Sequence, residues 1–263
     1  MKKLVLIVCL YFVSGLDKRF LVWRRYFAGF YTLSKVKWDV CIMLMADQHG
    51  VKITANCPKA VNLFNEAISE YLRMGKRTLA YLNDALEAYS ELIMAHCAKG
   101  YFQAFNTRWG ISSGMHASLE EAELGLKTQG GTESEKRHTL ALRALADGNL
   151  LETVRVWEEI LLEQPRDALA LRLAHSYYFI LGDQLNLRDS MARAMHAWNE
   201  SIPNYGYILG TYAFGLQENG DYRAGEATAK RSVELNADDL YGAHALTHVH
   251  EMGHAIVRAR SGF

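Results

Sequence analysis

Apolar residues recur at every third or fourth position along most of the chain from Ala60 onward, and strand-like alternation is nearly absent. This period places apolar side chains on one face of an α-helix. The segment 60–75 is the first example, and we expect its helix to end at Gly75. Its apolar stripe comprises Val61, Phe64, Ala67, Ile68 and Leu72. The pattern predicts an all-α fold, and only three prolines interrupt it.

Polar residues indicate where two further helices begin. Ser118 is followed three residues later by Glu121, which is the spacing of a capping box. Thr132 precedes a second acidic first turn, and the same kind of start is expected there. We therefore expect helices to begin at Ser118 and at Thr132.

A repeat is clearest over residues 137–263. Its turn glycines are Gly148, Gly182, Gly220 and Gly253, separated by 34, 38 and 33 residues. Segments around the first and third glycines also align at Leu150 with Tyr222 and at Asp167 with Asp239. A period near 34, with glycine after a first helix and proline after a second, is typical of tetratricopeptide repeats.

The repeat predicts a tetratricopeptide-like solenoid of helical hairpins over residues 45–263. Trp157 is expected to fill the space between neighbouring repeats, and Pro165 to stop a second helix. In such stacks the first helices line a concave inner surface. The chain stops part-way through an expected second helix after Gly253, which suggests truncation at the C-terminus.

Three strings of this sequence resemble the tetratricopeptide repeat protein 38 family. They are "GNLLETVRVWEEILLEQPRDALALRLAHSYYFILGDQLNLRDSMARA", "IPNYGYILGTYAFGLQENGDYRAGEATAKRSVELNADD" and "AHALTHVHEMG". With weaker similarity upstream, the resemblance covers roughly residues 46–253. It implies an N-terminal portion of a repeat solenoid, and it leaves the biochemical function open.

The first 44 residues differ from the rest of the chain. They carry eight Lys or Arg against two Asp or Glu, whereas the remainder carries 21 against 27. Residues 1–15 have the basic start and short apolar run of a secretory signal. The segment 1–44 is either an extension upstream of a true start at Met45, a signal or membrane anchor, or an extra helix. The protein is expected to be cytoplasmic, or exported if residues 1–15 act as a signal.

Composition and motifs exclude several classes of function. An acidic body argues against nucleic-acid binding, because that binding depends on Lys and Arg that neutralise phosphates. The four cysteines form no C-x-x-C pair, so zinc-finger and redox motifs are missing and free thiols are expected. No dinucleotide or phosphate-loop fingerprint occurs, and we expect no cofactor.

Residues 250–254 read His-Glu-Met-Gly-His, which fits the H-E-x-x-H signature of zinc proteases. A third ligand normally follows, but the nine residues after His254 contain no His, Asp or Glu. The repeat also predicts a turn at Gly253 that would separate the two imidazoles. We therefore interpret the motif as a false match.

A second histidine set lies on the expected first helices. His244, His248 and Glu251 share one helical face. Two more histidines on first helices, His96 and His175, could converge on the same inner groove. The leading interpretation is a non-catalytic scaffold that binds a protein or peptide partner. The alternative is that these five residues form a metal or catalytic site.

Overall fold

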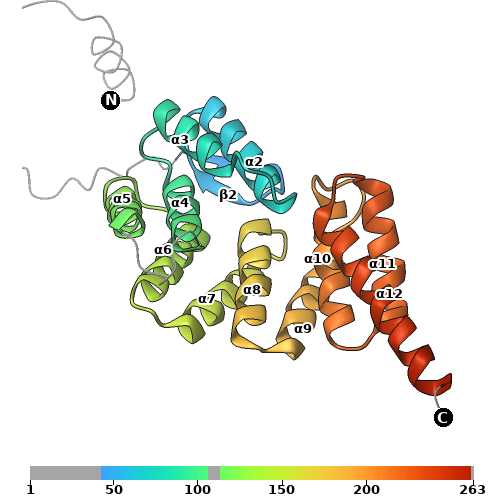
Figure 1. Ribbon diagram of the computed structural model, residues 1–263. Helices are drawn as coiled ribbons and strands as arrows, with labels where there is room; N and C mark the ends of the chain where they lie inside the picture. Colours follow the sequence, from blue (N-terminus) through green and yellow to red (C-terminus); the bar gives the residue numbers. More distant parts are fainter. Residues whose placement is uncertain (1–42, 106–112, 262–263) are drawn as a thin grey trace, which may run out of the picture. The chain divides into compact units, whose positions relative to one another are not determined.

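The computed structural model describes residues 43–105 and 113–261 (Figure 1). The chain divides into two units, Met1–Asp39 and Val40–Phe263, and every described residue belongs to the second. The signal, anchor and extra-helix interpretations of residues 1–44 fall almost entirely outside the described residues. Only Met43 and Leu44 of that segment are described.

The described part is all-helical apart from one short hairpin. Its strands are β1 (Leu44–Ala46) and β2 (Lys52–Thr54), paired antiparallel with Met45 opposite Ile53. Its α-helices are α2 (Pro58–Leu72), α3 (Thr78–Ala88), α4 (Ile93–Phe105), α5 (Ser113–Gln129), α6 (Glu133–Ala146), α7 (Leu150–Glu163), α8 (Ala168–Leu181), α9 (Gln184–Ala194), α10 (Tyr205–Glu218), α11 (Tyr222–Leu235) and α12 (Leu240–Ser261). The predicted all-α class is confirmed, and the hairpin was not predicted.

Helices pack on their neighbours in chain order, as in an α-solenoid. The hairpins are α2/α3, α4/α5, α6/α7, α8/α9 and α10/α11, and α12 packs on both members of the last pair. Helix α2 also touches α8, which is distant from it in sequence (Figure 1). The first hairpin therefore lies against the fourth, and α2 also meets α4 through the rings of Tyr71 and Phe102, whose centroids are 4.5 Å apart.

Local chemistry explains the confirmed boundaries. The predicted stripe of α2 is buried, namely Val61, Phe64, Ala67, Ile68 and Leu72. Thr132 begins α6 with a capping box whose second member is Glu135. Trp157 on α7 is fully buried in the core of the protein. Its ring centroid lies 5.3 Å from that of Tyr101 and 5.1 Å from that of Tyr177. Pro165 follows the last residue of α7 by two positions.

Three of the four predicted turn glycines are confirmed. Gly148, Gly182 and Gly220 have φ values of +74°, +71° and +80°, a left-handed conformation that glycine adopts without strain. A polar residue follows each of them and occupies the N-cap of the next helix, as Asn149 and Asp183 do. These turns join each first helix to the second helix of its hairpin.

The predicted turn at Gly253 is wrong, because α12 continues through it to Ser261. The residue after this glycine is His254, whereas the other three turns have Asn or Asp there. Without a capping side chain, the free N–H groups of a new helix would lack their usual partner. The sequence shows that no capping residue follows Gly253, and the repeat period alone gave the wrong prediction of a turn there.

The predicted start at Ser118 is also wrong. Helix α5 begins five residues earlier, at Ser113, because Met115 already belongs to its buried stripe with Leu119 and Ala122. The Ser118 hydroxyl instead donates to the side-chain oxygen of Gln103 on α4, 3.0 Å away. The end of α2 differs slightly as well, since the left-handed residue is Met74 and not Gly75.

No helix within residues 43–105 and 113–261 combines the length and apolar character needed to cross a bilayer.

Candidate functional site

The structure brings two of the predicted inner-face histidines together. The rings of His244 and His248, one turn apart on α12, have centroids 4.3 Å apart. Both lie against Phe214 of α10, at 5.7 and 6.2 Å. Partial burial and the neighbouring His248 lower the pKa of His244, so its neutral form is favoured near pH 7.

His175 lies in the same aromatic cluster but is committed to structure. Its Nδ1 is 3.1 Å from the carbonyl oxygen of Leu187, and its Nε2 is 3.3 Å from the hydroxyl of Tyr241. Burial, together with the positive charge of Arg172, lowers its pKa well below the usual value. The neutral ring thus donates through Nδ1 to α9 and accepts through Nε2 from α12, joining three helices to one another.

The other predicted residues do not join this pair. His96 lies on α4 and its Nε2 contacts the carbonyl oxygen of Ser90 at 2.7 Å. Glu251 is exposed on α12. Within the part of the chain that the structure describes, no three His, Cys, Asp or Glu side chains are grouped to hold a metal ion.

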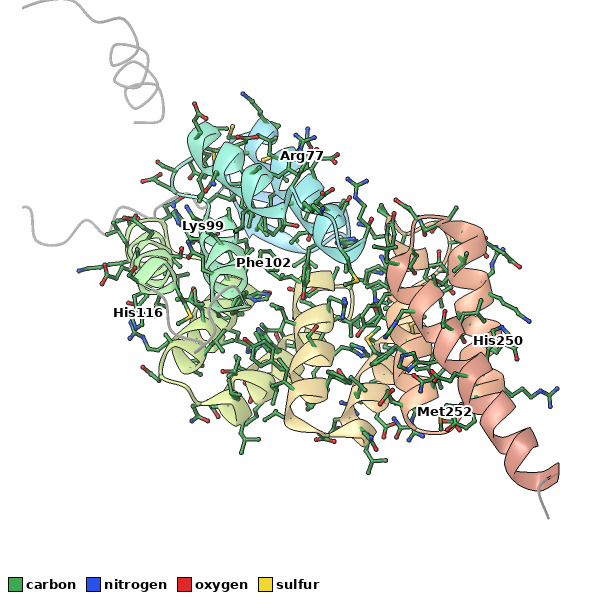
Figure 2. The ribbon with its side chains drawn as sticks, viewed as in Figure 1. Arg77, Lys99, Phe102, His116, His250 and Met252 are labelled. Atoms are coloured by element: carbon green, nitrogen blue, oxygen red, sulfur yellow. The ribbon has the colours of Figure 1, made fainter. Side chains whose placement is uncertain are left out.

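The H-E-x-x-H string lies on one continuous helix, contrary to the predicted separation by a turn. Figure 2 labels His250 and Met252 of this segment on α12. The backbone therefore places residues 250 and 254 one helical turn apart. A zinc protease normally has a third ligand after the second histidine, and the nine residues after His254 contain no His, Asp or Glu.

An aromatic row crosses three successive even-numbered helices. We define it as Phe179 on α8, Phe214 on α10, and Tyr241, His244 and His248 on α12. Phe179 and Phe214 have ring centroids 5.6 Å apart, and Phe214 and Tyr241 are 5.2 Å apart. Phe179 is 54% exposed, and His244 is also exposed. The row thus runs from one repeat to the next, with the exposed Phe179 and His244 joined through the buried Phe214. Periodicity alone did not reveal it.

A pocket of about 460 Å³ adjoins this row. Its walls are the end of α2 with the turn that follows it, the start of α3, and parts of α4 and α8. The lining residues are Tyr71, Met74, Gly75, Lys76, Thr78, Leu79, Phe102, Arg172 and Ser176. Figure 2 shows Phe102 on the side of α4 that faces α8.

Arg172 connects the pocket to the aromatic row. Its guanidinium carbon lies 4.0 Å from the ring centroid of Tyr241 and 6.0 Å from that of Tyr71. Its Nη1 donates to the hydroxyl of Ser176 at 3.2 Å. The sequence analysis missed Arg172, because residues from α2, α4 and α8 that are distant in sequence assemble around it. An arginine inside the apolar run 168–181 was the available signal.

None of the known protein-family models matches this chain, and no solved structure shows significant similarity to it. The function is therefore inferred from the residues of this chain.

Proposed function

We propose that this protein is a tetratricopeptide-like scaffold that binds a peptide or a segment of a partner protein, without catalysis of its own. The aromatic row is the observation that supports the proposal most. Aromatic side chains that remain exposed on a rigid surface are the usual anchors of protein interfaces. Here Phe179 and His244 are exposed on either side of the buried Phe214. Because α8, α10 and α12 pack in order, the row is held rigid.

The tetratricopeptide assignment is supported by the hairpin turns. Three glycines of similar backbone geometry each precede an Asn or Asp cap, and Trp157 and Pro165 occupy their expected places. Membership of the tetratricopeptide repeat protein 38 family is part of this proposal, and the three resembling strings support it. The matching strings include Phe179, Phe214, His244 and His248, so four of the five residues of the row belong to the segments that carry the resemblance.

A cytoplasmic location is the third part of the proposal. The thiols of Cys57 and Cys97 are both free. Free thiols are usual where the compartment is reducing. Imaging of the full chain with a fluorescent tag at its C-terminus would test this, and secretion into the medium would contradict it.

Two observations argue against a metal or catalytic site. His175 uses both ring nitrogens for hydrogen bonds between helices, and the Nε2 atom of His96 contacts the carbonyl oxygen of Ser90, just before α4. These contacts assign two of the five candidate residues to structure. The pair His244 and His248 is better explained as part of the aromatic row.

Selection of random peptides on the immobilised full chain would test the scaffold proposal. Affinities of the selected peptides are then measured by fluorescence anisotropy for the wild type, for Phe179→Ser in the row, and for Leu162→Ser as a matched control. Leu162 is an exposed apolar residue of α7 outside the row. We expect Phe179→Ser to weaken binding about tenfold and Leu162→Ser to leave it unchanged. Selected peptides that bind both variants equally would overturn the proposal.

A further inference from the structure

Arg172 is a buried cation whose charge is not matched by an acid. Only 5% of the residue is exposed, and no carboxylate among the described residues lies within 4 Å of its guanidinium group. Its Nε is buried and has no hydrogen-bond partner. Burying a charged group is costly unless it is paired and hydrogen-bonded, so this arrangement requires an explanation.

The contacts that Arg172 does make satisfy only part of it. The two tyrosine rings interact with the face of the guanidinium group, and Ser176 accepts from Nη1. A guanidinium group has five N–H donors, and the structure gives an acceptor for Nη1 and none for Nε. Asp239 is influenced by this charge, but its oxygens accept hydrogen bonds from Ser232 and from the Tyr241 N–H.

The pocket beside Arg172 is suited to an anion. Its lining contains two cationic side chains, Arg172 and Lys76, and no acidic one. This charge contrasts with the acidic balance of residues 45–263. Helix α3 begins at Thr78 in the pocket wall, and the N–H of its N-cap residue Arg77 already donates to the Glu70 carboxylate, which is paired with Arg73. The apolar part of the lining includes Leu79, Phe102 and the ring of Tyr71.

We propose that this pocket binds a carboxylic acid with an apolar or aromatic body. The carboxylate accepts from the guanidinium group of Arg172, in the planar geometry that arginine offers to such groups. The apolar body lies against Phe102 and Leu79. A volume of about 460 Å³ is in the range of small-ligand sites. The site shares the contact between Arg172 and Tyr241 with the aromatic row. Phe179 does not line the pocket, so Phe179→Ser tests the row and Arg172→Met tests the pocket.

Such a carboxylate could belong to a free small acid or to the C-terminus of a peptide. The probes are 4-phenylbutyrate, its neutral analogue 4-phenylbutyramide, a short peptide ending in Phe, and the same peptide amidated at its C-terminus. Binding to the full chain is measured by isothermal titration calorimetry. We expect each acid to bind about tenfold or more tightly than its amide, because a charge-assisted hydrogen bond is lost. Preference for the free acid or for the peptide identifies the source.

Two variants and a control complete the test. Arg172→Met should abolish the preference for acid over amide, and Lys76→Gln should reduce acid affinity two- to threefold. Arg155→Met removes a positive charge from the exposed face of α7 and should change nothing. If Arg172→Met does not fold, the comparison of acid with amide on the wild type and on Lys76→Gln still decides. Equal binding of acid and amide, or no binding of any probe, would overturn the proposal.

Discussion

Single buried polar residues in this chain connect helices that are distant in sequence. His175 is the clearest case, since one imidazole joins α8 to the Leu187 carbonyl of α9 and to Tyr241 of α12. The sequence analysis correctly placed it on a first helix, but its role depends on partners 12 and 66 residues away. Periodicity identifies a residue's face, and it cannot identify what the residue will contact.

Protonation of His175 should make stability depend on pH. Its pKa in the folded protein is lowered, so the unfolded chain binds a proton that the folded protein excludes. Stability is therefore complete above the unfolded pKa of about 6.5 and falls below it, by up to about 1.4 kcal/mol per pH unit. Urea unfolding of wild type and His175→Asn at pH 7.5 and 5.5 checks this, since asparagine can still donate to Leu187.

The variant should lose less stability than the wild type between the two pH values. His250→Asn, at an exposed position on α12, is the control and should retain the wild-type dependence. An unchanged pH dependence in His175→Asn would show that the ring is not held neutral.

At the scale of helices, two glycines that look equivalent in the sequence have opposite roles. Gly182 has φ +71°, and a side chain there would meet open space, so only the backbone conformation requires glycine. Gly182→Ala should therefore cost about 1 kcal/mol. Gly253 lies inside α12, where alanine is the better helix former, and Gly253→Ala should stabilise by about 0.5–1 kcal/mol. Chemical denaturation measures both, and a destabilised Gly253→Ala would indicate a turn at residue 253.

Features of single helices could be predicted where they depend on residues that are close together in the sequence. The stripe of α2, the capping box at Thr132 and three turn glycines follow from residues within about four positions of one another. The β1–β2 hairpin was missed because three-residue strands show no alternation that can be distinguished from chance. Its stabilising partner, Glu135, is 81 residues from Thr54. The Arg172 pocket was missed because its lining residues, from α2, α3, α4 and α8, are also distant from one another in sequence.

The hairpin should depend on Glu135 of α6 for stability. The carboxylate is fully buried and accepts from the N–H of Thr54, from its hydroxyl at 2.6 Å, and from the N–H of Thr132. Thr54→Val keeps the shape but removes the hydroxyl donor to a buried carboxylate, at an expected cost of about 1.5–3 kcal/mol. Thr128→Val, on the exposed face of α5, is the matched control and should have little effect on the unfolding free energy. Equal effects of the two substitutions would contradict this role.

At the scale of the described residues, the segment between α9 and α10 contacts α2 and the β1–β2 turn, which are distant from it in sequence. Asn204, just before α10, donates to the Ser69 hydroxyl of α2 at 3.1 Å and lies near His49. His49 in turn packs on Trp198, with ring centroids 5.4 Å apart. The proposed acid site also depends on helices that are distant in sequence, because α2 supplies one wall of the pocket and α8 supplies the arginine.

A double-mutant cycle tests whether this contact persists in solution. Ser69→Ala removes the acceptor, and Asn204→Gly removes the donor while it preserves the left-handed backbone at φ +65°. If α2 remains in contact with the segment before α10, the two substitutions should show a coupling energy of about 0.5–1.5 kcal/mol in urea unfolding. Asn204→Gly combined with Thr128→Val on α5 should be additive within about 0.5 kcal/mol. Additivity in both cycles would mean that α2 and the segment before α10 separate in solution.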